Sequence, residues 1–286
     1  MPEEIVPKPP QPGAAGRFGN LQQRIGSALV MVGIALGLDY AGVTPFAFLV
    51  LAAGLLLSWE WGHVVRKTDG DLAVLVHAGA VALATVLGAS GHPALAVCSL
   101  LAGAVAVVPL TIGQRARLSA AGVLYVGMPA VAMLWLRSDE SYGFLAVIFV
   151  FLIVWSTDTM AYVAGRSIGG AKLWPSVSPN KTWAGFIGGV GTSMILCAMF
   201  AQLVPGASSV RLAIIGLLLA VLAQGGDLAE SALKRKFGVK DASGLIPGHG
   251  GLMDRLDGLI AVAVAAGILA LAVNPKSPAA ALLIGV

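Results

Sequence analysis

Long apolar runs alternate with short polar connections along the chain from residue 25 onward. An α-helix needs about 20 consecutive, mainly apolar residues to cross a bilayer, and most of these runs come close to that length. We predict nine spanning helices, the first of them short for a full crossing, at residues 25–38, 43–62, 72–89, 93–112, 118–136, 143–164, 184–204, 209–226 and 257–273. The pattern therefore predicts an all-α, polytopic integral membrane protein.

Three polar stretches interrupt this pattern. Residues 1–24 are polar and rich in proline, which is typical of a disordered tail, and we expect no cleavable signal peptide there. The other two stretches are the long connections 165–183 and 227–256. We divide the chain accordingly into the tail, a set of N-terminal helices at 25–136 for support and lipid access, and a catalytic membrane region at 137–286.

Composition agrees with a protein that has no soluble domain. Charged residues make up 11% of the 286 residues and hydrophobic residues 57%, whereas a soluble domain carries about 25% charged residues. The two cysteines, Cys98 and Cys197, both lie inside apolar runs. We therefore expect neither a disulfide nor a zinc site.

The basic residues are distributed unevenly between the two sides of the predicted membrane region. With the N-terminus in the cytoplasm, only Arg137, Arg211 and Lys276 of the 18 Lys and Arg residues fall on the far side. The positive-inside rule favours this asymmetry, and eight or ten spans would remove it. We predict nine helices, a cytoplasmic N-terminus and both long connections on the cytoplasmic side of a bacterial-type inner membrane.

Carboxylates gather at helix ends near that side. Asp227 follows the eighth predicted helix, and Asp254 and Asp257 lie three residues apart where the ninth begins. Because Mg²⁺ is usually held by one or two carboxylates together with substrate phosphates, we expect these three aspartates to bind Mg²⁺, with a second cation left open. For Asp254 taken alone, stabilisation of a helix dipole explains the charge equally well. Asp158 and Tyr162 share a helix face near the end of the sixth predicted helix.

Glu60 lies between Trp59 and Trp61 at the end of the second predicted helix. Tryptophans are common at membrane interfaces, and a glutamate beside them can extend to the water. The sequence leaves open whether Glu60 is functional or only interfacial.

The connection 227–256 also carries a basic run, formed by Lys234, Arg235, Lys236 and Lys240. Such a run can simply anchor a membrane protein beside anionic lipids. Here it is followed by a glycine-rich turn that leads into the ninth helix, which favours a phosphorylated substrate instead.

In this turn, Gly248, Gly250 and Gly251 let the backbone approach an anion closely. The N–H groups at the start of the ninth helix favour phosphate. The sequence leaves three roles open for His249: a hydrogen-bond donor to phosphate, a general acid or base, or a loop residue with no role in chemistry.

The connection 165–183 repeats the basic and hydroxyl side chains, with Arg166, Lys172, Ser178, Lys181 and Thr182. It is not a P-loop, because the GxxxxGK[ST] spacing does not occur. The sequence also lacks HExxH, GxSxG and CxxC motifs. We therefore expect neither a zinc enzyme nor a serine hydrolase.

Three segments resemble the phosphatidate cytidylyltransferase (CDP-diacylglycerol synthase) family. The longest extends from Ser231 to Asp257 with the pattern S-A-L-K-R-x4-K-D-x5-P-G-H-G-G-x2-D-R-x-D. The others are D-T-x-A-Y-x2-G-R at 158–166 and S-P-x-K-T at 178–182. The sequence departs from the family pattern at Met160, where glycine is frequent, and at Ala184, where an acidic residue often precedes the glycine.

The resemblance implies a nucleotidyltransferase that uses Mg²⁺, CTP and phosphatidic acid of the bilayer, and releases CDP-diacylglycerol and pyrophosphate. It implies catalytic roles for Asp227, Lys234, Arg235, Lys240, Asp241, His249, Asp254 and Asp257. It implies substrate contacts for Asp158, Tyr162, Arg166, Ser178, Asn180, Lys181, Thr182, Ser231, Gly248, Gly250, Gly251 and Arg255.

Two other functions stay open. A CTP-dependent lipid kinase of the polyprenol or phytol type resembles this family in its C-terminal helices, but the complete signature favours the cytidylyltransferase. An ion-coupled transporter usually places its carboxylates near the bilayer midplane, whereas here they lie at helix ends. We expect membrane lipids and no nucleic acid as partners, and a homodimer is left open because the apolar first half has no evident chemistry.

Overall fold

The computed structural model describes residue 26, residues 29–245 and residues 250–286. Apart from one two-stranded hairpin, the regular secondary structure in this part of the chain is helical, which confirms the predicted all-α class. Eight of its helices are long and apolar enough to cross a membrane. The predicted tail at 1–24 and the residues Gly248 and His249 lie outside the described residues.

The long helices follow the predicted apolar runs. They are α2 (Val43–Arg66), α3 (Leu72–Ala89), α4 (Pro93–Leu110), α5 (Ala116–Arg137), α6 (Gly143–Ser167), α7 (Trp183–Phe200), α8 (Ser209–Lys236) and α9 (Met253–Val273). The first predicted span corresponds to a shorter apolar helix, Leu29–Tyr40. The 3-10 turn η1 (Ala201–Leu203) extends α7, and the short helix α10 (Pro278–Leu283) packs with all its residues buried. The nine-span count and the cytoplasmic N-terminus stay predictions.

Both long polar connections contain regular secondary structure. α8 continues to Lys236, so 227–236 is helical and not part of a connection. These residues are mostly Ala, Leu, Glu, Lys and Arg, which favour helix, and the helix ends just before Gly238, whose φ of 67° few other residues adopt easily. The connection 165–183 contains an antiparallel hairpin of β1 (Lys172–Trp174) and β2 (Ser178–Thr182).

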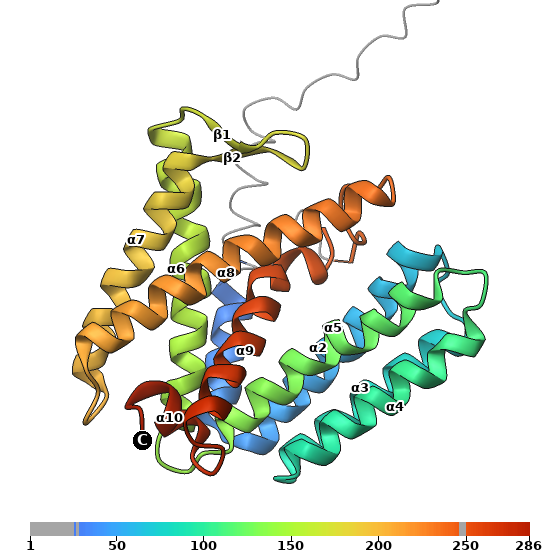
Figure 1. Ribbon diagram of the computed structural model, residues 1–286, viewed down its shortest axis with the longest axis horizontal. Coiled ribbons are helices and arrows are strands. Elements are labelled where there is room, and N and C mark those ends of the chain that lie inside the picture. Colours follow the sequence, from blue (N-terminus) through green and yellow to red (C-terminus); the bar gives the residue numbers. More distant parts are fainter. Residues whose placement is uncertain (1–25, 27–28, 246–249) are drawn as a thin grey trace, which may run out of the picture.

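The helices form two groups (Figure 1). In the first, α2, α3, α4 and α5 pack against one another; in the second, α6 packs on α7, α7 on α8 and α8 on α9, and α9 joins the groups through α5. The apolar core follows the same division. One cluster surrounds α6, and the other lies among α2–α5 and also takes up Phe237 and Met253 from the ends of α8 and α9.

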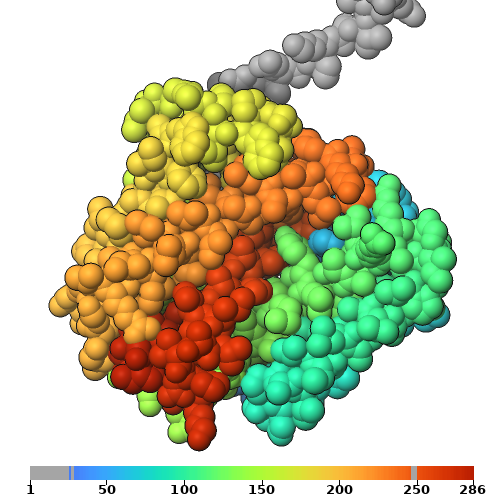
Figure 2. Space-filling model, viewed as in Figure 1, coloured from blue at the N-terminus to red at the C-terminus, as the bar shows by residue number. Residues whose placement is uncertain are grey.

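Glycines bring α6 and α7 into backbone contact. A Cβ at Gly185 would lie 2.6 Å from the carbonyl oxygen of Ala161, and a Cβ at Gly189 would lie 2.6 Å from that of Thr157. Small residues allow membrane helices to approach this closely. The end of α6 and the start of α7 therefore stay together, and the hairpin between them sits directly against α8 (Figure 2).

Candidate active site

A cleft of about 1280 Å³ is shared by both helix groups and the hairpin. Its polar wall comes from α6, the hairpin, α8 and α9, and contains Asp158, Tyr162, Arg166, Asn180, Lys181, Thr182, Asp227, Asp254, Arg255 and Asp257. Its apolar wall comes from the helix Leu29–Tyr40, α2, α5 and α6, and contains Met31, Ile34, Phe46, Leu49, Met133, Phe151 and Trp155. The fold thus brings together residues that the sequence assigned to separate motifs, beside a surface that can hold hydrocarbon.

Close packing of α8 on α9 places Asp227 beside Asp257. A Cβ at Gly226 would lie 2.8 Å from the carbonyl oxygen of Asp257 and 2.8 Å from Cβ of Ala261. Asp227 and Asp257 both line the cleft and are partly exposed in it. Asp257 accepts a hydrogen bond of 2.7 Å from the N–H of Gly258.

Lys181 connects the hairpin to α8. Its ammonium group pairs with one carboxylate oxygen of Asp227 and donates to Oε1 of Gln224 at 3.3 Å. The hydroxyl of Ser231 donates to the other oxygen of Asp227, also at 3.3 Å. Gln224 was missed by the sequence analysis, although a lone glutamine within an apolar run is a signal that could have found it.

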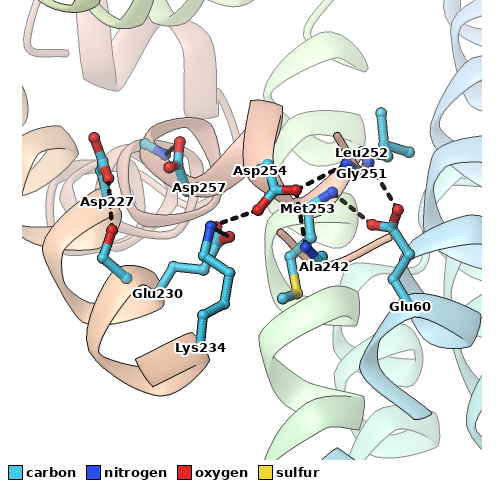
Figure 3. A network of polar contacts seen from close by, with 12 residues as sticks. Glu60, Asp227, Glu230, Lys234, Ala242, Gly251, Leu252, Met253, Asp254 and Asp257 are labelled. Atoms are coloured by element: carbon cyan, nitrogen blue, oxygen red, sulfur yellow. Dashed lines mark hydrogen bonds and ion pairs between the residues drawn. The ribbon is translucent and has the colours of Figure 1, made fainter. Parts of the chain in front are cut away.

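Lys234 lies between two carboxylates (Figure 3). Its Nζ is 2.9 Å from Oε1 of Glu230 and also pairs with Oδ1 of Asp254. The Lys234, Glu230 and Asp254 side chains are only 11%, 0% and 7% exposed. Lys234 is not among the described residues that line the cleft. In this structure the ammonium group is held by these two carboxylates, and its predicted contact with a triphosphate stays a prediction.

Asp254 is held on its other oxygen as well. Oδ2 accepts hydrogen bonds from the N–H groups of Ala242 at 2.9 Å and Gly251 at 2.8 Å. Among the described residues, no group of three His, Cys, Asp or Glu side chains is arranged to hold a metal. Asp254 lines the cleft but is engaged on both oxygens by Lys234 and the backbone, so its predicted role as a metal ligand stays a prediction. Asp227 and Asp257 fit a Mg²⁺ site of two carboxylates completed by substrate phosphates.

The first N–H groups of α9 also meet carboxylates of the chain. Oε1 of Glu60 accepts from the N–H of Leu252 at 2.8 Å, and Oε2 accepts from the N–H of Met253 at 2.6 Å (Figure 3). The N–H groups of Gly251, Leu252 and Met253 thus donate to Asp254 and Glu60, and the expectation of a phosphate at this helix end stays a prediction. Gly250, with φ of 82°, likewise faces Asp254, whose Oδ2 would be 2.8 Å from an added Cβ.

The other predicted residues divide between the cleft and the surface. Thr182 is buried and caps α7 by accepting the N–H of Gly185 at 3.1 Å, while Ser178 is partly exposed on β2. Tyr162 and Arg166 are exposed at the cleft, with Nη1 of Arg166 3.5 Å from the Tyr162 hydroxyl. Three of the predicted catalytic residues, Arg235, Lys240 and Asp241, are exposed and lie outside the described cleft wall.

Comparison with known proteins agrees with this geometry. A family model described as the cytidylyltransferase family matches residues 22–273. The chain belongs to the cytidylyltransferase family. It is 39% identical over 247 residues to the phosphatidate cytidylyltransferase of Brucella abortus biovar 1 (strain 9-941), covering 86% of this chain and 92% of that protein. Over 141 residues it is 43% identical to the phosphatidate cytidylyltransferase of Bacillus subtilis (strain 168), covering 49% of this chain and 52% of that protein.

Membership in the cytidylyltransferase family suggests one shared role for the cleft residues, which is binding of phosphorylated substrates. A transferase of this kind has to bring two phosphorylated groups together, and the polar wall carries both cationic side chains (Lys181, Arg166, Arg255) and two adjacent carboxylates (Asp227, Asp257). Cations can bind phosphate directly, and carboxylates can do so through a bound metal ion.

We expect Gly226→Ala to impair this cytidylyltransferase much more than Gly225→Ala. The added methyl group at 226 meets the backbone of Asp257 and forces α8 away from α9, at a cost of about 1–3 kcal/mol for overpacking. Gly225, the neighbouring control, has nothing within 4 Å of an added Cβ. Thermal unfolding in detergent and transferase activity measure the difference. Equal effects of the two substitutions would contradict the close packing at 226.

Proposed function

We propose that this protein is a phosphatidate cytidylyltransferase that makes CDP-diacylglycerol and pyrophosphate from CTP and phosphatidic acid. The observation that carries the proposal is the cleft, in which a wall of carboxylates and cations adjoins a wall of apolar side chains. Relatives named phosphatidate cytidylyltransferase, one aligned over 86% of this chain, support it. As an integral membrane protein with several apolar helices, it has direct access to a lipid substrate.

The two walls suggest how phosphatidic acid binds. Its acyl chains would lie against Phe46, Phe151 and Trp155, where hydrocarbon is accepted at little cost. Its phosphate would lie near Arg255 and Arg166, whose guanidinium groups suit phosphate oxygens. We infer that CTP enters from the cytoplasm, in line with the predicted orientation of the helices in a bacterial-type inner membrane.

The chemistry needs no nucleophilic side chain. An oxygen of the lipid phosphate attacks the α-phosphorus of CTP, a new P–O bond forms, and the bond from that phosphorus to the bridging oxygen breaks, releasing pyrophosphate. The residues of this cleft would act by orienting both substrates and by neutralising charge, which are the main contributions of proteins to such transfers. Lys181 and Asn180 reach the cleft from the hairpin and are suited to the phosphates of the nucleotide.

Asp227 and Asp257 are the residues that would hold Mg²⁺ in this cleft. Both face it, and they come from helices in contact at Gly226. When bound there, the cation would supply positive charge to the phosphates. Lys181, which pairs with Asp227 in this structure, would then be released toward the nucleotide.

The test is a product analysis of the purified protein in mixed micelles with CTP, Mg²⁺ and phosphatidic acid. We expect a lipid that carries CMP, together with an equal amount of pyrophosphate. A parallel incubation with CTP and a polyprenol tests the kinase alternative. A phosphorylated alcohol and CDP in that incubation, without a CMP-bearing lipid in the first, would overturn the proposal.

A further inference from the structure

We propose that Glu60 is a positioning residue of the active site, which holds the start of α9 from within the N-terminal helix group. The inference deepens the proposed function and rests on it, because it concerns how Asp254 and Asp257 are kept in place. Glu60 itself is not among the described residues that line the cleft. It therefore acts on the reaction through α9.

The contacts of Glu60 are those of a helix cap supplied by a distant segment. Its two oxygens accept three hydrogen bonds. Two come from the N–H groups of Leu252 and Met253 (Figure 3), and the third comes from the hydroxyl of Ser243 at 2.5 Å. The first N–H groups of a helix have no partner within the helix, and α9 has no side-chain cap of its own at Leu252. A carboxylate is also the charge that the helix dipole favours at this end.

Burial makes these contacts strong and makes their loss costly. Glu60 is 0% exposed, so its charge is compensated by these donors and not by water. Hydrogen bonds to a buried charged group contribute more than neutral ones, and donors left unsatisfied in the interior carry a penalty. The position of α9 is therefore closely coupled to the position of this carboxylate.

The end of α2 that carries Glu60 is itself held firmly. The indole N–H of the adjacent Trp61 donates to the carbonyl oxygen of Leu118 at 3.0 Å. Nη1 of Arg115 donates to the carbonyl oxygen of Val65 at 2.6 Å. Both bonds join α2 to the segment around the start of α5. Glu60 thus transmits the position of the N-terminal helix group to α9.

The chain from this cap to the reacting groups is short. Met253, which donates to Glu60, directly precedes Asp254, and Asp257 follows one turn later on α9. On the other side, a Cβ at Gly251 would lie 2.5 Å from Oε1 of Glu60. A displacement of about 1 Å at a catalytic group can reduce turnover by about 10²-fold, so a modest shift of α9 has a large effect.

The test compares Glu60→Gln and Glu60→Ala with the wild-type enzyme, and uses Glu140→Gln at an exposed glutamate as the matched control. We expect kcat to fall about tenfold in Glu60→Gln and about 10²-fold in Glu60→Ala. Glutamine keeps one acceptor oxygen but turns its NH₂ group toward the N–H of Met253. Glu140→Gln should leave kcat unchanged.

Two readouts separate positioning from a mere loss of folded protein. Hydrogen–deuterium exchange of the peptide at 250–256 should become about tenfold faster in Glu60→Ala, because two N–H groups lose their acceptor. Gly251→Ala should reduce activity at least about tenfold in the wild type but less than about threefold in the Glu60→Ala background, where the clash with the carboxylate is gone and only the 3.0 Å contact with Cβ of Ala242 remains.

Unchanged exchange at 250–256, or additive effects of the Glu60 and Gly251 substitutions, would overturn the positioning role. These outcomes differ from failure of the proposed function. If the wild type forms no CMP-bearing lipid, that function is wrong, while the exchange measurement still decides whether Glu60 holds α9.

Discussion

Asp257→Asn should reduce the formation of CDP-diacylglycerol by about 10³-fold or more, the scale seen when a group that stabilises transition-state charge is removed. Asp257 lines the cleft beside Asp227, where its negative charge can hold a cation against the substrate phosphates. Asparagine has nearly the same shape and keeps one oxygen to accept the N–H of Gly258. The loss should therefore be chemical, with the fold retained.

The measurement is turnover of CTP with phosphatidic acid in reconstituted vesicles, together with membrane insertion and thermal unfolding of the same preparations. Insertion and unfolding should match the wild type. Glu140→Gln, at an exposed carboxylate that lies outside the described cleft wall, should cost far less. Near-normal turnover in Asp257→Asn would remove this residue from the cation site, and loss of insertion would instead assign it a structural role.

Lys234→Met should produce the largest loss of stability among single substitutions at the active site. Lys234 is the cation between the buried carboxylates of Glu230 and Asp254, and methionine leaves both without it. Removing one partner of a buried ion pair costs about 3–5 kcal/mol, because the remaining charge stays buried and uncompensated. Since Asp254 also holds the N–H groups of Ala242 and Gly251, activity should be lost together with stability.

Thermal unfolding in detergent and the KM for CTP distinguish this role from phosphate binding. If Lys234 is a positioning residue, Lys234→Met should lower the unfolding temperature. Adding Glu230→Gln to the same chain should restore part of the lost stability, because it removes one of the two buried negative charges. Lys236→Met, at an exposed lysine two residues further along α8, is the matched control and should be close to neutral. Normal stability with a raised KM for CTP would show that Lys234 binds the nucleotide.

Hydropathy predicted the helices well because the constraint on them is local. The predicted span 72–89 coincides with α3, and 93–112 differs from α4 only at its end. A membrane-spanning helix satisfies its own backbone hydrogen bonds, so its length and composition are sufficient to identify it. The prediction failed where helices continue past the apolar run, as α8 does to Lys236, because charged residues also favour helix.

The site was predicted less completely, for a different reason. Motif spacing identified the residues around the cleft, including Asp158, Lys181, Asp227 and Asp257, without any knowledge of their contacts. It assigned Lys234 to a triphosphate and Asp254 to a metal. In the structure these two side chains are paired with each other, and both assigned roles stay predictions. Sequence spacing shows which charged side chains are available, but it does not show which of several charged neighbours each of them will pair with.

Glu60 illustrates the same limit. It lies 192 residues from Leu252 in the sequence, and no local pattern relates the two. By itself the sequence determined that this is a helical membrane protein and that its charged chemistry lies at the ends of three helices, because hydropathy and helical period act over short distances. Only the tertiary structure decided which carboxylates face the cleft and which backbone N–H groups each of them holds. That choice depends on how the end of α2 meets the start of α9, where buried N–H groups and buried charges must satisfy one another.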